Sequence, residues 1–312
     1  LFELERLGAF AAARNVRAAI YLRVTPGIEA HTHDYIKTGQ IDSKFGFPLG
    51  DALDTAVARA LANPALDLAG FHCHIGSQIH ELTPFADAAQ IMAAQIARVK
   101  ARHGHSLREL DLGGGLGIRY TGEDDPKAPG ELARQVVAAL ERASREHGIA
   151  RPRVLVEPGR SIVGEAGTTL YTVGSVKEIP GVRTYAAIDG GMGDNPRVAL
   201  YKAKYEAVLA NKAGRTPDRR VSIAGKCCES GDMLIWDLDV PEIGPGDILA
   251  IFSTGAYNYA MAGNYNRLPR PAMVLVQGGR AEVIVERERY EDLARFDRIP
   301  LHLAAAAVEG PA

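Results

Sequence analysis

The chain has 312 residues, of which 46% are hydrophobic and 24% are charged, as in ordinary globular proteins. Its formal net charge is −2, from 36 basic and 38 acidic residues, and both signs are scattered along the sequence. This distribution argues against a nucleic-acid partner and against a polybasic membrane-binding segment. The longest apolar runs, such as 301–308, are too short to span a bilayer, so we expect no membrane partner.

The three cysteines, Cys73, Cys227 and Cys228, are an odd number, and two of them are adjacent. Such a set does not form a disulfide framework, which favours a reducing, cytoplasmic location. No charged segment followed by an apolar stretch marks a signal peptide. The chain begins with Leu1 rather than Met, and we take this as a first sign that further residues precede it.

The first half of the chain alternates helical and strand patterns. Apolar spacing predicts helices over 1–14, 51–62, 84–102 and 131–147. Short buried strands are predicted over 18–24, 69–74, 110–112 and 154–156. This alternation is typical of βαβ units and a parallel sheet. A complete (β/α)8 barrel has eight units. Four units would therefore form half a barrel, with an open edge at the first strand.

After about Gly167 the pattern changes to short β-branched segments separated by Gly/Pro turns. Strands are predicted over 169–176, 185–188, 221–224, 248–252, 273–276 and 282–286. This pattern favours an antiparallel, barrel-like β domain. We therefore expect an α/β domain over residues 1–165 and a β domain over 166–312.

Three consecutive predicted strands end in polar or glycine-rich residues. They are followed by the motifs His72-Cys73-His74-Ile75-Gly76-Ser77, Gly113-Gly114-Gly115 and Glu157-Pro158-Gly159-Arg160. Parallel α/β folds bind ligands at the carboxyl ends of their strands, where glycine backbones can present N–H groups to a phosphate. The β-rich half adds a thiol and a second carboxylate in Cys228-Glu229-Ser230-Gly231-Asp232. These groups together could hold a pyridine-type cofactor and an amino-acid substrate.

Several longer strings show a family resemblance. They are Tyr35-Ile36-Lys37-Thr38-Gly39 with Ser43-Lys44-Phe45-Gly46, FHCHIGSQI at 71–79, LDLGGGLG at 110–117, EPGR at 157–160, DGGMGDNPRVALY at 189–201, CESGD at 228–232 and GAYNYAMAGNYN at 255–266. In this order, over about residues 20 to 295, the chain resembles the diaminopimelate decarboxylase family of fold-type III pyridoxal-phosphate enzymes. The resemblance implies decarboxylation of meso-2,6-diaminopimelate to L-lysine and CO2.

The resemblance also implies a cofactor site for pyridoxal 5'-phosphate. Glu157 would pair with the pyridine nitrogen and keep it protonated, which makes the ring an electron sink. His74 would stack on the ring face. The phosphate would be held by a set drawn from several motifs: Ser77, Gly115, Gly159, Arg160 and Tyr257.

The substrate site implied by the resemblance uses residues from both halves. Its distal carboxylate would be bound by Arg160, Arg197 and Tyr201, since a planar guanidinium suits a carboxylate; Tyr257 also belongs to the substrate site. Glu229 would accept the distal ammonium group, and Cys228 would be the acid that donates a proton after CO2 leaves. Cys228 and Glu229 would reach the site of a partner subunit, so a homodimer with shared active sites is implied.

One family feature has no counterpart in the sequence. Family members form a Schiff base through a lysine in a Tyr-Ala-x-Lys-Ala-Asn type string on the first barrel strand, and no such string occurs here. Lys37, Lys44 and Lys226 do not match that position. We therefore expect the first four βα units to lie upstream of Leu1, and this chain alone to be unable to bind the cofactor covalently.

Other readings of the same residues remain open. His72 and His74, like His31 and His33, form H-x-H pairs that could bind zinc, although we find no further ligands at strand ends. Cys228 could be an inert apolar residue, the three glycines a tight turn, and the arginines surface ion pairs. The activity could be that of a related ornithine, arginine or carboxynorspermidine decarboxylase. A non-catalytic homologue that uses the fold to bind a partner is the remaining alternative.

Overall fold

The computed structural model describes residues 1–28 and 43–304. The chain divides into two compact units. The α/β unit comprises Leu1–Gly167 and the short segment Ser253–Ala256, and the β unit comprises Thr168–Phe252 and the residues from Tyr257 onward. The predictions that fall on His31, His33 and the string at 35–39 lie outside the described residues.

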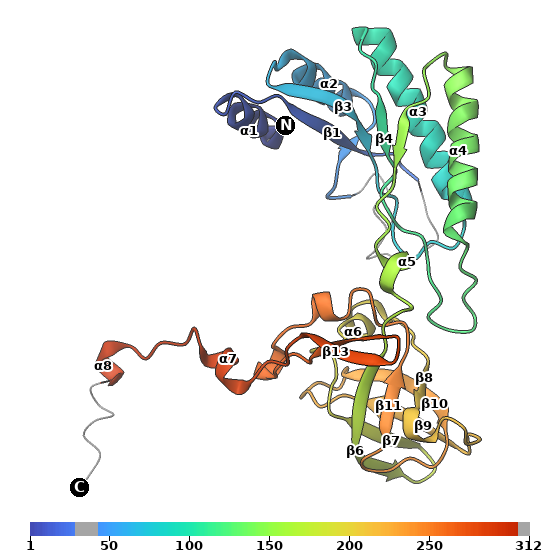
Figure 1. Cartoon of the computed structure of the whole chain (residues 1–312), viewed down its shortest axis with the longest axis vertical. Helices are drawn as coiled ribbons and strands as arrows, with labels where there is room; N and C mark the ends of the chain where they lie inside the picture. Colours follow the sequence, from blue (N-terminus) through green and yellow to red (C-terminus); the bar gives the residue numbers. More distant parts are fainter. Residues whose placement is uncertain (29–42, 305–312) are drawn as a thin grey trace. The chain divides into compact units, whose positions relative to one another are not determined.

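The α/β unit contains a parallel sheet of five strands in the order β2-β1-β3-β4-β5 (Figure 1). The strands are β1 (Ala18–Thr25), β2 (Phe47–Pro48), β3 (Leu66–His72), β4 (Glu109–Asp111) and β5 (Arg153–Leu155). The helices are α1 (Phe2–Ala12), α2 (Asp51–Ala62), α3 (Thr83–His103), α4 (Pro129–Glu146) and α5 (Arg160–Val163). The predicted parallel sheet is confirmed. The two-residue strand β2, which the sequence did not reveal, pairs with the end of β1.

Helices α3 and α4 lie side by side and cover the sheet (Figure 1). On α4, Val136, Ala139, Leu140 and Ala143 are buried, which is the three- and four-residue spacing of one helix face. The carboxylate of Glu131 accepts a hydrogen bond from the Ala128 N–H at 3.0 Å and so satisfies a donor that the first helical turn leaves open. Helix α3 is followed by Gly104, whose φ of +63° is a left-handed conformation favoured by glycine.

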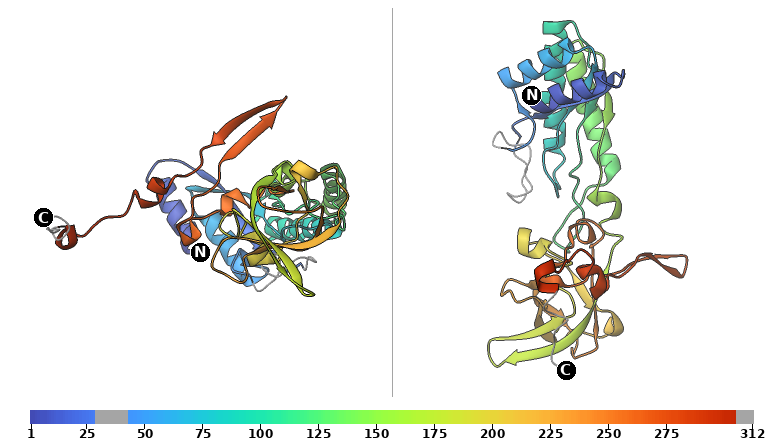
Figure 2. Two further views of the ribbon diagram at one scale, coloured as in Figure 1. Left: turned by 90° about the horizontal axis from the view of Figure 1, so that it is seen from below. Right: turned by 90° about the vertical axis from the view of Figure 1, so that its left-hand side faces the viewer.

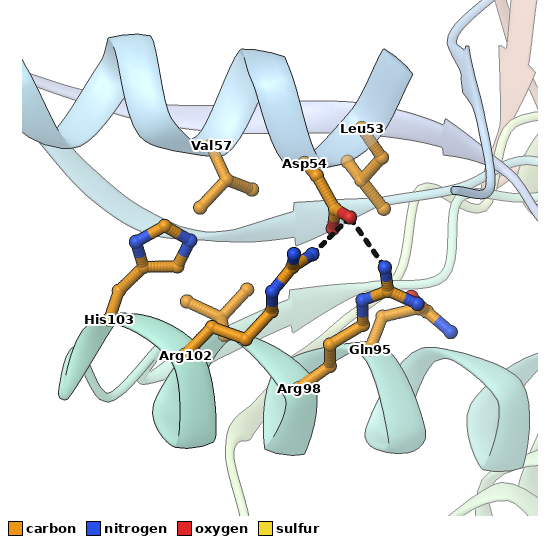
Figure 3. Close-up of a pocket in the computed structure, with 8 residues that line it drawn as sticks. Leu53, Asp54, Val57, Gln95, Arg98, Arg102 and His103 are labelled. Carbon is orange, nitrogen blue, oxygen red and sulfur yellow. Dashed lines mark hydrogen bonds and ion pairs between the residues drawn. The ribbon is translucent and has the colours of Figure 1, made fainter. Parts of the chain in front are cut away.

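Ion pairs link helices α2 and α3 beside a small cavity that residues of both helices line (Figure 3). Asp54 on α2 accepts hydrogen bonds from Arg98, at 2.5 Å, and from Arg102, both on α3. Burial alone would raise the pKa of Asp54, but these two guanidinium groups hold it below its ordinary value. The cluster links the two helices through one oxygen of the Asp54 carboxylate.

The β unit contains a mixed sheet of six strands in the order β10-β9-β7-β6-β11-β8. The strands are β6 (Thr169–Ile179), β7 (Arg183–Ile188), β8 (Ala207–Leu209), β9 (Arg219–Ala224), β10 (Met233–Val240) and β11 (Ile248–Ile251). The edge strands β10 and β8 also contact each other, so the sheet curves toward closure. The predicted purely antiparallel pattern is wrong at one pair, because β7 and β9 run parallel. They can do so because thirty residues separate them, enough for a crossover.

The rest of the β unit consists of short elements. They are α6 (Arg197–Tyr201), three short 3-10 helices (Ala210–Lys212, Tyr259–Met261 and Tyr265–Arg267), the hairpin strands β12 (Met273–Gln277) and β13 (Arg280–Val285), α7 (Tyr290–Ala294) and α8 (Leu301–Ala304). The hairpin projects from the other strands of this unit (Figure 2). Among the helices of the described residues, none is long and apolar enough to cross a membrane.

Candidate active site

The carboxyl ends of four strands in the α/β unit lie in register. Arg23 on β1 pairs with His72 on β3, which in turn pairs with Asp111 on β4, opposite Leu155 on β5. Because parallel strands end at the same edge of a sheet, the motifs that follow these residues emerge side by side. Backbone hydrogen bonds extend this ladder: the Glu157 N–H donates to the Gly113 carbonyl at 2.8 Å.

The three glycines after β4 are required by the close approach of neighbouring backbones. A Cβ on Gly114 would lie 2.3 Å from the carbonyl oxygen of Glu157, and a Cβ on Gly115 would lie 2.3 Å from the carbonyl oxygen of Gly76. Gly115 also has a φ of +120°, which L-residues rarely adopt. The glycines therefore bring the end of β4 into contact with the segments that carry His74 and Glu157.

His74 is held as a neutral ring beside this backbone. Its Nδ1 accepts a hydrogen bond from the Gly114 N–H at 3.2 Å, and an accepting imidazole nitrogen carries no proton. Burial lowers the pKa of His74, and the nearby Arg23 and His72 lower it further. A neutral imidazole can stack its face on an aromatic ring without placing a charge against it.

Glu157 supplies the carboxylate of this cluster. Its Oε2 lies 3.3 Å from Nε2 of His72, and its side chain is 58% exposed, so it keeps acceptor capacity for a ligand. Arg23 faces the same carboxylate: burial lowers the pKa of Arg23, whereas Glu157 opposes that shift. Arg23 was not predicted as a site residue, although a charged residue within the buried strand β1 was a visible signal in the sequence.

Two carboxylates bear on the alternative of a metal site. Ligand atoms of His72, Asp111 and Glu157 lie within 4.8 Å of one another, so Asp111 and Glu157 offer strand-end donor atoms that were not predicted from the sequence as metal ligands. However, His72 and Glu157 already pair directly, and Oδ1 of Asp111 accepts the Gly113 N–H at 2.8 Å. His72 and Asp111 therefore already have hydrogen-bond partners without an ion.

Arg160 is a buried guanidinium and not a surface ion-pair residue. It is 7% exposed, donates to Oγ of Ser77 at 2.9 Å and also donates to the hydroxyl of Tyr120. Two of the residues predicted to bind the phosphate, Ser77 and Arg160, are thus in contact. Gly159 lies directly before α5 and is exposed. The role of Tyr120 could not be read from the sequence, because its partner is forty residues away.

In the β unit, Arg197 on α6 is likewise buried, at 5% exposure. It donates to the hydroxyl of Tyr205 at 2.5 Å, and this hydroxyl lies 3.3 Å from Oδ1 of Asn258. The neighbouring Tyr257 is exposed and has a φ of +62°. Tyr201 ends α6 and is half-buried. The network therefore ties two of the predicted substrate-binding segments together.

The three cysteines differ sharply in environment. Cys73 is fully buried, and burial raises its pKa to about 12. Burial and the Asp232 carboxylate raise the pKa of Cys227 to about 11. Cys228 is exposed, and beside it Glu229 accepts a hydrogen bond from the hydroxyl of Tyr265. Cys228 is therefore the thiol that a ligand can reach.

The strand-end residues fit the cofactor that the sequence suggested. The Glu157 carboxylate has acceptor capacity for a protonated ring nitrogen. The neutral ring of His74 suits an aromatic face. The glycine backbone, with the Ser77 hydroxyl and the Arg160 guanidinium, suits a phosphate. The description of the matching family model gives the same class: pyridoxal-dependent decarboxylase, pyridoxal binding domain, over residues 1–164.

Comparison with individual relatives shows which family of pyridoxal-dependent decarboxylases the chain resembles. The chain is 53% identical to the diaminopimelate decarboxylase of Bacillus subtilis over 279 residues, 89% of this chain and 64% of the relative. It is 52% identical to that of Halalkalibacterium halodurans, over 95% of this chain and 68% of the relative. A crystal structure of the Helicobacter pylori diaminopimelate decarboxylase complexed with L-lysine superposes with a TM-score of 0.85 at 33% identity, covering 95% of this chain and 71% of that one. The chain belongs to the diaminopimelate decarboxylase family, and it spans about two thirds of the length of these relatives.

Proposed function

We propose that the full-length protein catalyses the pyridoxal-phosphate-dependent decarboxylation of meso-2,6-diaminopimelate to L-lysine and CO2. The observation that carries this proposal is the cluster at the ends of β3, β4 and β5, where Gly114 contacts both His74 and the Glu157 backbone. The curated relatives support the choice of substrate by their names.

When bound, pyridoxal phosphate supplies an electron sink for the electrons released as the carboxylate leaves. Glu157 would accept a hydrogen bond from the ring nitrogen and keep it protonated, because an ionised carboxylate stabilises a neighbouring cation. His74 would cover one face of the ring and exclude water from it. The phosphate would be held by Ser77, Arg160, the glycine backbones at 115 and 159, and the Tyr257 hydroxyl.

The substrate has an amino-acid group at each end, so its distal end carries one negative and one positive charge. Arg160, Arg197 and Tyr201 bind the distal carboxylate, and the carboxylate of Glu229 binds the distal ammonium group. This pairing of charges distinguishes diaminopimelate from ornithine, whose distal end carries the ammonium group alone. The thiol of Cys228 then donates its proton to the carbon from which CO2 departs.

The same proposal extends to the complete barrel, the oligomeric state and the cellular location of the protein. The parallel sheet of the α/β unit is part of a closed (β/α)8 barrel, as the resemblance to this family implies. The protein is a homodimer in which Cys228 and Glu229 complete the site of the second copy. Its location is cytoplasmic, which is supported by three cysteines that are all free thiols.

The test measures CO2 release and lysine formation by the full-length protein with pyridoxal phosphate. Turnover of meso-diaminopimelate, but not of ornithine or arginine, is expected. Release of CO2 from ornithine but not from diaminopimelate would move the protein to a related decarboxylase. Absence of turnover with every one of these substrates would favour the non-catalytic homologue.

A further inference from the structure

Asp232 is buried between two loops of the β unit. It closes the turn that carries Cys228 and Glu229, and it is 3% exposed. Its Oδ1 accepts the Met192 N–H at 2.7 Å, and its Oδ2 accepts the Cys227 N–H at 2.8 Å. One carboxylate therefore binds the loop that leads to α6 and also the turn that bears the exposed thiol.

Backbone contacts reinforce this link on both sides. The Asp232 N–H donates to the Glu229 carbonyl at 3.0 Å, which closes the turn itself. The Lys226 N–H donates to the Gly190 carbonyl at 3.0 Å, which joins the start of the turn to the other loop. The turn is thus fastened at its beginning and at its end.

Two glycines leave room for the Asp232 carboxylate. A Cβ on Gly225 would lie 2.2 Å from its Oδ2, and a Cβ on Gly191, where φ is +155°, would lie 2.5 Å from the same oxygen. The surrounding backbone is therefore fitted to a carboxylate at this position. A longer side chain such as glutamate would not fit without moving the loops.

We propose that Asp232 is a positioning residue that locks the Cys227–Glu229 turn to the Gly190–Asp194 loop, so that Cys228 is presented to substrate while Cys227 is withheld. The two adjacent thiols are separated in this way into a usable and an unusable one. The role of Cys228 in this statement rests on the function proposed above, whereas the locking of the turn does not.

The thiols themselves provide the test. Alkylation by iodoacetamide, with each modified cysteine identified by mass spectrometry, is measured against pH for the wild type, Asp232→Asn and the control Asp239→Asn. Asp239 is an exposed aspartate on β10, paired with Arg220 at 2.8 Å. Below a thiol's pKa, each unit by which that pKa falls raises the thiolate fraction about tenfold.

Asn at position 232 offers one acceptor oxygen for two N–H donors and carries no charge. The Cys227 rate profile of Asp232→Asn is therefore expected to move to lower pH, with at least a roughly tenfold faster reaction near pH 8. Asp239→Asn should match the wild type. A Cys227 rate profile of Asp232→Asn that matches the wild type at every pH would contradict the proposal, because the thiol would then not depend on the Asp232 carboxylate.

A measurement on the unmodified protein covers the case in which Asp232→Asn does not fold. The amides of Met192 and Cys227 should be protected from hydrogen exchange, and free exchange of both would overturn the proposal. In the active protein, Asp232→Asn is expected to lower kcat about tenfold or more and to change KM less, because the proton donor is displaced. If the wild-type full-length protein shows no decarboxylation while the Cys227 rate profile of Asp232→Asn still moves to lower pH, the proposed function is wrong and the locking role stands.

Discussion

The fit of Gly114 between two strand ends yields a quantitative prediction. In Gly114→Ala, the new Cβ would lie 2.3 Å from the Glu157 carbonyl oxygen, whereas real Cβ contacts are essentially never under 3.0 Å. The two segments must therefore separate by about 0.7 Å or more. That movement stretches the 2.8 Å hydrogen bond between the Glu157 N–H and the Gly113 carbonyl past its useful range.

The cost can be estimated from these two effects. Overpacking of this kind destabilises by about 1–3 kcal/mol, and a lost backbone hydrogen bond adds about 1 kcal/mol. The lower entropy of alanine in the unfolded chain offsets up to about 1 kcal/mol. We therefore expect Gly114→Ala to lower the free energy of unfolding by about 1–4 kcal/mol and to weaken pyridoxal-phosphate binding.

Urea unfolding followed by far-UV circular dichroism measures this change, because the long helices α3 and α4 belong to the same unit. The matched control is Gly130→Ala on α4, where the nearest group to a new Cβ is the flexible Arg134 guanidinium at 3.5 Å. That control should be stabilised by about 0.4–1 kcal/mol, because alanine has less conformational entropy to lose on folding. Equal stability and equal cofactor affinity for Gly114→Ala and the wild type would refute the reasoning.

Three further predictions concern single side chains. Glu157→Gln should lower kcat for decarboxylation about a hundredfold or more, since a neutral amide does not balance a protonated ring nitrogen; a loss below threefold would contradict this. Cys228→Ala should lower lysine formation by about 10²–10⁴-fold, whereas Cys227→Ala should retain most activity, and the reverse order would reject our choice of thiol. Hydrogen bonds from Arg270 depress the pKa of Glu288 from 4.5 to about 2, so its contribution to stability is present above about pH 4.5 and is lost as the pH falls toward 2. Unfolding measured at about pH 5 and pH 3 should show a smaller difference for Glu288→Gln than for the wild type, and an equal difference would disprove the link.

Much of the α/β unit could be predicted because its elements carry strong local signals. The helix predicted over 51–62 has the observed bounds of α2, since its apolar residues recur at helical spacing. The strand predicted over 69–74 is found as Leu66–His72, so His74 lies beyond the strand end. Boundaries of this kind depend on pairing with neighbouring strands, which a local pattern does not contain.

The β unit was harder to predict. Strand β10 (Met233–Val240) was missed because Asp237, with a φ of +54°, interrupts its alternation of side chains. The parallel pairing of β7 with β9 is a long-range contact with no local signature. For the candidate site, the grouping of the strand-end motifs followed from one general property of parallel sheets. The contribution of Arg23 depended instead on cross-strand register, which became visible only in the structure.

The central claim is that the ends of β3, β4 and β5 surround one pyridoxal phosphate. A crystal structure of the protein with this cofactor tests it most directly, through the distance from the ring nitrogen to the Glu157 carboxylate. We predict a hydrogen-bond distance of about 2.7–2.9 Å, with His74 against the ring face and the phosphate beside Gly115 and Ser77. A ring nitrogen that faces another group, or a phosphate bound away from these residues, would contradict the account.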